Sequence, residues 1–154
     1  MRRFLICLSL GLTALALPFA NAADEATDSD AAQLAGVYRF VSGEKNGGEA
    51  PDENLKQSKV SITAKEIVAT DQADKRTYVA TYKLDTSKKP WRISMESILP
   101  AVGAKAEGLV EKDGDTVKII YALPGGETPT EFKTKEMQHL WVLKAQAKPG
   151  EKQE

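Results

Sequence analysis

The sequence predicts an all-β protein that folds as a single up-and-down antiparallel barrel of about eight strands. Short segments alternate apolar and polar residues with a period of two, which is typical of strands with one buried face. Turn-forming residues separate these segments, and helical periodicity is nearly absent. Eight consecutive antiparallel strands leave two exposed edges unless the sheet closes on itself, so closure into a barrel is favoured. A sandwich of two sheets is the competing architecture.

Residues 1–22 predict a signal peptide that is removed from the mature protein. The segment starts Met-Arg-Arg, is almost wholly apolar over residues 4–19, and ends in Ala-Asn-Ala, an A-x-A cleavage site. The apolar run is shorter than the roughly 20 residues that cross a bilayer as a helix. We therefore expect cleavage near Ala22 and export to the periplasm or the extracellular space. No stable membrane insertion is expected after cleavage.

Cys7 is the single cysteine of the chain and lies inside this predicted signal peptide. Too few apolar residues precede it for the lipidation motif of a bacterial lipoprotein, and the apolar run continues after it. The mature chain would contain no cysteine, so disulfide bonds cannot stabilise it even in an oxidising compartment.

The mature chain divides into one domain and two flanking segments. Residues 23–33 are acidic and small, and we expect a disordered leader there. Residues 146–154 predict a flexible tail. The domain between them, residues 34–145, is large enough for one modest hydrophobic core, and we expect a monomer.

Eight segments of this domain have the strand pattern. In residues 91–97, for example, Trp91, Ile93 and Met95 alternate with Arg92 and polar neighbours. The predicted strands are residues 36–43, 59–63, 66–70, 76–84, 91–97, 106–112, 116–121 and 139–144.

The connections between these segments contain recognisable turn residues. Asp-Gly-Asp at 113–115 predicts a tight hairpin, because glycine tolerates the positive φ that such a turn requires. Residues 85–90 predict a second turn, which ends at Pro90. Residues 51–57 alone have helical character, with proline at a first-turn position followed by acids, and predict one short helix.

The longest connection contains a proline-flanked glycine pair, in the sequence YALPGGETPTEF at 121–132. A Walker-type phosphate loop needs a following Lys-Ser/Thr and a helix, and this segment has neither. Pro124 and Pro129 stiffen the two shoulders, while Gly125 and Gly126 permit a turn; we expect a positive φ at Gly125. The segment therefore predicts a shaped loop at one mouth of the barrel, and a lid over a cavity is the alternative.

Four segments that span nearly the whole folded region have a recognisable order and spacing: LAGVYRFVSGEKNGGEAP, TYKLDTSKKP, LVEKDGDTVKIIYALPGGETPTEF and WVLK. In these segments the chain resembles a family of small exported domains expanded in planctomycetes. The family is uncharacterised, and its domain is regarded as lipocalin-like. The resemblance implies a barrel and export, and it implies no reaction.

Lipocalin-like barrels often open with Gly-x-Trp, in which the tryptophan closes one barrel end beneath a basic side chain from the last strand. The corresponding triplet here is Gly36-Val37-Tyr38, and Lys144 is the candidate basic partner. A tyrosine offers less area and a weaker cation contact than a tryptophan. The resemblance therefore implies barrel closure by Tyr38 and Lys144 in a weakened form.

The sequence offers little material for catalysis or metal binding. His139 is the only histidine, and without a cysteine in the mature chain a tetrahedral metal site cannot be assembled. Residues 113–115 match only a fragment of a calcium loop, and no G-x-S-x-G nucleophile motif occurs. Paired carboxylates remain conceivable, but the acids fall in turns and on polar strand faces. We expect no metal, no cofactor and no enzyme activity.

The charge pattern argues against a nucleic-acid partner. The formal net charge is −1 and the chain has no long basic run.

Five predicted inward residues are candidates for the lining of a ligand cavity. They are Phe40, Tyr82, Met95, Ile119 and Tyr121. The alternative is that the same side chains fill a packed core, each contributing about 1.5–3 kcal/mol by burial. Trp141 alternates with Leu140 and Val142, so we expect it on the outside, where it would mark a partner surface.

Together these patterns predict an exported, non-catalytic, lipocalin-like domain that binds a small apolar or amphipathic molecule or acts as an accessory domain. The alternative is a protein-interaction module with a packed barrel, whose contact surface is Trp141 and the loop from Pro124 to Pro129. An enzyme of unknown class is the third hypothesis.

Overall fold

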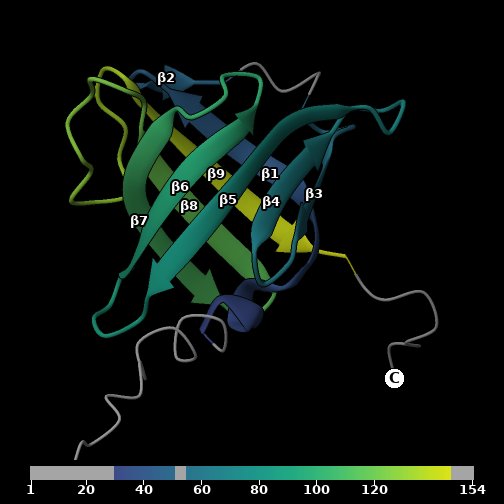
Figure 1. The fold of residues 1–154 in the computed structure, drawn as a ribbon, viewed down its shortest axis with the longest axis horizontal. Helices are drawn as coiled ribbons and strands as arrows, with labels where there is room; N and C mark the ends of the chain where they lie inside the picture. Colours follow the sequence, from purple (N-terminus) through teal and green to yellow (C-terminus); the bar gives the residue numbers. More distant parts are fainter. Residues whose placement is uncertain (1–29, 51–54, 147–154) are drawn as a thin grey trace, which may run out of the picture.

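The computed structural model describes residues 30–50 and 55–146, and within these ranges nine strands form one antiparallel sheet. The sheet order follows the chain from β1 to β9, apart from the short β2, and β1 also pairs with β9. The sheet therefore closes into an eight-stranded up-and-down barrel with one extra strand (Figure 1). The strands are β1 Gly36–Lys45, β2 Gly48–Glu49, β3 Lys59–Ile62, β4 Glu66–Thr70, β5 Arg76–Asp85, β6 Trp91–Leu99, β7 Lys105–Asp113, β8 Thr116–Ala122 and β9 Gln138–Ala145.

This architecture confirms the predicted lipocalin-like barrel and rules out the two-sheet sandwich. All eight predicted strand segments are strands, and the additional β2 pairs only with the far end of β1. The predicted hairpin is also present: Asp113 pairs with Thr116, and Gly114 adopts a φ of 57° between β7 and β8.

The helical part of the chain lies elsewhere than predicted. Residues 51–54 fall outside the described residues, and residues 55–57 form a turn rather than a helix. The single-turn 3₁₀ helix η1, Ala32–Leu34, instead lies at the end of the segment predicted to be a disordered leader. Ala31 and Leu34 are only 2% and 0% exposed, because the barrel itself covers these two apolar side chains.

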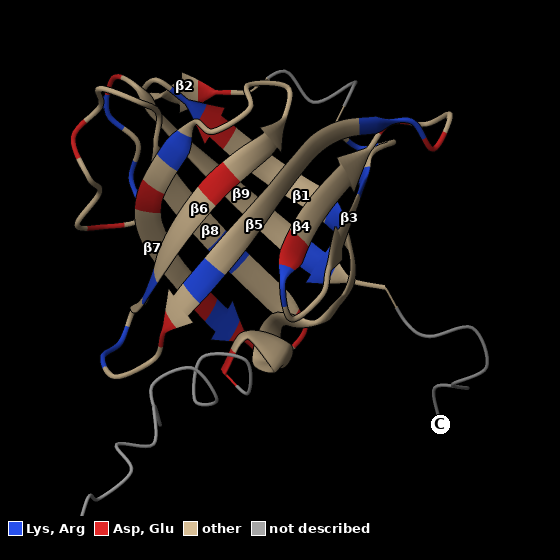
Figure 2. Cartoon of the chain, viewed as in Figure 1, with Lys and Arg blue, Asp and Glu red and all other residues tan. Residues whose placement is uncertain are grey.

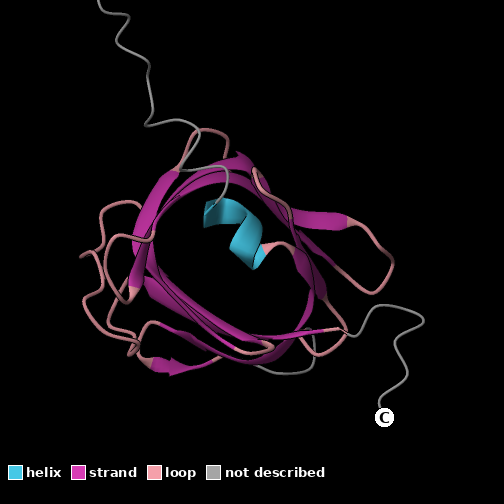
Figure 3. Cartoon of the chain, turned by 90° about the horizontal axis from the view of Figure 1, so that it is seen from below, coloured by secondary structure: helices cyan, strands magenta, loops and turns pink. Residues whose placement is uncertain are grey.

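The segment around η1 closes one end of the barrel, where it crosses the opening (Figure 3). The hydroxyl of Tyr38 donates a hydrogen bond of 2.7 Å to the carbonyl of Leu34. The hydroxyl of Tyr82 lies 3.0 Å from the Ala31 carbonyl oxygen and 2.7 Å from that of Thr63. The two hydroxyls therefore give backbone carbonyls of the η1 segment hydrogen-bond donors inside the barrel. We call this end of the molecule the plugged end.

The inner face of the barrel holds the main hydrophobic core. Side chains from most strands alternate into it, including those of Val60, Ile62, Leu84, Ile93, Val110, Val117 and Leu143. Lysine, arginine, aspartate and glutamate residues are distributed over the outer faces and the loops (Figure 2). The period-two pattern of the sequence therefore separates the buried face from the solvated one.

A second, smaller cluster lies on the outside of the barrel. The connection between β8 and β9, residues 123–137, folds back over the outer face of the sheet (Figure 1). Its Phe132 packs on Leu109, Ile120 and Leu140, which point outward from three adjacent strands. The loop therefore buries three apolar residues of the outer face.

No helix among the described residues is long and apolar enough to span a membrane.

Candidate functional site

The end of the barrel opposite η1 contains a cavity of about 340 Å³. The part of its wall nearer the plugged end, called the lower wall, is apolar and includes Val60, Ile67, Met95, Ile119 and Leu143. Its rim is formed where β1 and β8 end and where β5 and β9 begin. The rim residues are Lys45, Thr77, Tyr78, Tyr121 and His139. None of the described residues that line it is an aspartate or a glutamate. We call this space the barrel cavity.

The structure places four of the five predicted lining residues at the barrel cavity. Phe40, Met95, Ile119 and Tyr121 contribute to its wall. Tyr82 does not line it, because its side chain is buried lower in the barrel, with its hydroxyl directed to the plugged end. The inward direction of all five follows from strand alternation, whereas their height along the barrel does not.

Trp141 lies at the barrel cavity and not on the outer surface, so its predicted orientation is wrong. Its ring makes an edge contact with Phe40, at 5.4 Å between centroids, and another with His139, at 5.8 Å. Leu140 faces outward in its place, where Phe132 covers it. Because both faces of β9 are apolar, alternation within this strand does not reveal which face is inside.

A chain of two hydrogen bonds crosses the rim of the barrel cavity. The indole Nε1 of Trp141 donates to the hydroxyl oxygen of Tyr121 over 3.2 Å. The same hydroxyl lies 3.4 Å from Nδ1 of His139, and the two rings make an edge contact at 5.6 Å. Since the Tyr121 oxygen accepts from Trp141, its own proton is available for Nδ1.

The ionisation states of the rim follow from burial and from Lys45. Burial, and then the nearby charge of Lys45, lower the pKa of His139 below its usual value, so the imidazole is neutral at pH 7. Burial raises the pKa of Tyr121, although the bond from Trp141 opposes the rise. Burial and the neighbouring Tyr121 raise the pKa of Tyr78 well above its usual range. Both phenols therefore stay protonated.

Lys45 supplies the only positive charge at the described rim at neutral pH. Its Nζ lies 5.3 Å from the centre of the Trp141 ring, and its backbone pairs with that of His139. Among the described residues, no carboxylate forms an ion pair with it. Lys45, Tyr78 and His139 were not among the residues predicted to line a cavity. His139 lies two residues before Trp141 in β9, so alternation places the two on the same face.

Tyr38 and Lys144 do not come together. Tyr38 is 2% exposed and bonds to the plug, whereas the Lys144 Nζ lies on the outside, 3.5 Å from an Asp115 carboxylate oxygen. Lys144 faces outward because it follows the inward Leu143 in β9. The plugged end is therefore closed by a helical turn and two tyrosine hydroxyls, and not by a cation over an aromatic ring.

The glycine-proline loop has the predicted turn. Gly125 has a φ of +89°, and the amide of Gly126 donates to the carbonyl of Leu123 over 2.8 Å. Pro129 is buried and Pro124 is exposed. No residue of the loop from 123 to 137 lines the barrel cavity, so in this structure the loop does not act as a lid.

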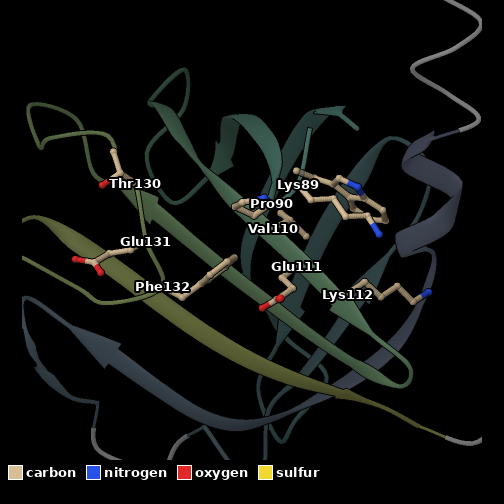
Figure 4. Close-up of a pocket in the computed structure, with 9 residues that line it drawn as sticks. Lys89, Pro90, Val110, Glu111, Lys112, Thr130, Glu131 and Phe132 are labelled. Carbon is tan, nitrogen blue, oxygen red and sulfur yellow. The ribbon is translucent and has the colours of Figure 1, made fainter. Parts of the chain in front are cut away.

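The same loop forms one wall of a second hollow, of about 500 Å³, on the outside of the barrel (Figure 4). The Phe132 ring projects from the loop toward Pro90 and Val110. Charged residues of both signs also line the hollow, namely Lys89, Glu111, Lys112 and Glu131. We call this hollow the outer groove.

Two other sources of functional information, metal-binding clusters and known relatives, give no assignment for this protein. In the described part of the chain, no three His, Cys, Asp or Glu side chains gather where they could hold a metal ion. In comparisons with known proteins, no family model, curated protein or solved structure matches this chain. Function is therefore argued from the barrel cavity.

Proposed function

We propose that the protein is an exported, non-catalytic, monomeric lipocalin-like domain that binds one small apolar or amphipathic molecule in the barrel cavity. The observation that supports this most is the asymmetry of the barrel. One end is filled by η1 and its tyrosine bonds, while the other retains a cavity with an apolar wall. Binding pockets for small molecules are commonly about 300–1,000 Å³ and mainly apolar.

The volume limits the size of the ligand. At the roughly 30 Å³ that one water molecule occupies in the liquid, 340 Å³ holds about eleven non-hydrogen atoms. This is the size of a medium-length alkyl chain with a small head group, or of a bicyclic aromatic compound. A larger ligand would project from the open end.

The first test is native mass spectrometry of mature protein purified from its own compartment. We expect a stoichiometric small-molecule adduct that denaturation releases. The variant Ala69→Phe should lose it, because Ala69 lines the barrel cavity and a phenyl ring would occupy that space. Val68→Phe on the same strand is the matched control and should keep the adduct. A wild-type protein that carries no adduct and takes up no added amphiphile would overturn the proposal.

The outer groove supports a second candidate function, that of a protein-interaction module. Phe132 lines the outer groove beside charges of both signs, and Pro124, in the stiff segment that ends at Pro129, is exposed on the same loop. Trp141 has no part in that surface, because it lies at the barrel cavity. Failure of ligand uptake together with a partner whose binding is lost in Phe132→Ala would favour this candidate.

Export is the remaining part of the proposal. It rests on the predicted signal peptide at residues 1–22, which lies outside the described residues. We expect the mature protein to begin at Ala23, which N-terminal sequencing of the exported form would establish.

A further inference from the structure

We propose that the barrel cavity selects a monoanionic amphiphile, such as a medium-chain carboxylate, with its head group at Lys45 and His139 and its chain against Met95 and Ile119. This inference rests on the proposed function and specifies the ligand class. Three features carry it: a cation with no carboxylate partner among the described residues, hydrogen-bond donors that gather at the rim, and an apolar wall below them.

The first feature is the charge of Lys45. Lys45 lines the barrel cavity, stands over Trp141, and has no carboxylate partner among the described residues. No aspartate or glutamate among the described residues lines the cavity. A bound anion would supply the missing charge, and a cationic head group would be repelled.

The second feature is the direction of the hydrogen-bond chain. Trp141 Nε1 can only donate, so Tyr121 accepts from it and directs its proton to Nδ1 of His139. A neutral imidazole that accepts at Nδ1 carries its proton on Nε2. Nε2 makes no hydrogen bond to a described residue. Its N–H can therefore donate a hydrogen bond to a ligand at the rim.

Lys45 and His139 then act together because they are opposite one another. The two residues are direct cross-strand partners in β1 and β9, and both line the barrel cavity. Cross-strand neighbours on one face have side chains within contact distance. The Tyr78 hydroxyl is a further donor at the same rim. A carboxylate accepts from all three groups, whereas an alcohol has fewer acceptor sites and no charge.

The third feature is the contrast with the lower wall. Met95, Ile119 and Leu143 have no polar side-chain atom that could bond a head group there. Burying a charge among them would be unfavourable, because nothing would replace its hydration. The alkyl chain therefore occupies the lower cavity and the carboxylate stays at the rim.

The binding test compares three probes with the same chain: decanoate, decanol and decyltrimethylammonium. Trp141 reports binding through its fluorescence, in a Trp91→Phe background that removes the other tryptophan of the chain. We expect decanoate to bind about tenfold or more tighter than decanol, which corresponds to about 1.4 kcal/mol. We expect the cation to bind weakest, and added salt to reduce the advantage of decanoate.

Lys45→Met identifies the source of the preference. We expect it to weaken decanoate binding about tenfold and leave decanol unchanged. Lys105→Met is the matched control, since Lys105 lies at the same end of the barrel but does not line the cavity. Equal binding of decanoate and decanol to the wild type would overturn the inference and leave the proposed function standing. Binding of none of the probes would overturn both.

A second measurement does not depend on any ligand. His139 is the only histidine, so its two ring nitrogens give one set of ¹⁵N resonances. We expect the tautomer with the proton on Nε2 in the native protein at pH 7. The variant Tyr121→Phe should reduce that preference, because Nδ1 loses its donor. A proton on Nδ1 in the wild type would contradict the proposed donor arrangement.

Discussion

At the scale of single residues, the pKa values of the tyrosines reflect their burial in the barrel. The chain has four tyrosines, and burial raises the pKa of every one of them. For Tyr82 the pKa rises to about 12. Each phenol is held in the neutral form because the phenolate would lose its hydration inside the barrel.

These shifts predict a loss of stability at high pH. The unfolded chain releases its phenol protons near pH 10, whereas the folded chain retains them. Since the unfolded state then binds fewer protons, the free energy of unfolding falls as the pH rises above about 10. Phenolate absorbance and thermal unfolding, followed together, should show tyrosine ionisation only as the protein unfolds. A tyrosine that ionises near pH 10 in the folded state would contradict this.

At the scale of elements, side chains tie the long β8–β9 connection to the β1–β2 turn. Thr134 is buried; its hydroxyl donates to Glu44 Oε2 over 2.8 Å and accepts from the amide of Gly47 over 3.1 Å. The amide of Met137 donates to Oδ1 of Asn46 over 3.0 Å. These bonds hold the loop so that Phe132 covers its apolar cluster.

The variant Thr134→Val should therefore release the loop. Valine has a similar shape but removes the hydroxyl bonds to Glu44 and Gly47, each of which contributes about 0.5–1.5 kcal/mol. Urea denaturation would measure the loss, and faster hydrogen exchange at Gly47 would locate it. Thr130→Val, at an exposed position of the same loop, should change neither. Slow exchange at Gly47 in Thr134→Val would show that the side chain does not anchor the loop.

Strands and loops differ in how far the sequence predicts them. Alternation is a local property, and all eight predicted strands are present. The turn at Gly114 and the positive φ at Gly125 were also predictable, because glycine is favoured there for steric reasons. The path of residues 123–137 over the outer face was not predictable, since it depends on contacts with β1, β7 and β8.

At the scale of the whole molecule, the barrel has one plugged and one open end. Leu34 is fully buried, although it belongs to a segment with little apolar character of its own. Leu34→Ala should destabilise the protein by about 2–5 kcal/mol, because the cavity it leaves lies inside the rigid barrel. Val37→Ala, at a position that is 45% exposed, is the control and should change stability little. Chemical denaturation would compare them, and equal midpoints would show that the plug is dispensable.

The sequence by itself determined the fold class, the strands and four of the side chains that face the barrel cavity. These are consequences of alternation and turn chemistry, which act between neighbours along the chain. Phe40, Met95, Ile119 and Tyr121 could be assigned to the inner face on this ground alone.

Only the tertiary structure decided whether the barrel is hollow, where it is closed, and which face of β9 lies inside. Whether space remains depends on the combined volume of side chains from eight strands and from η1, and no single segment encodes that sum. The inward position of Trp141 depends on Phe132 covering the opposite face of β9. The pairing of Lys45 with His139 likewise exists only because the first and last strands of the barrel meet.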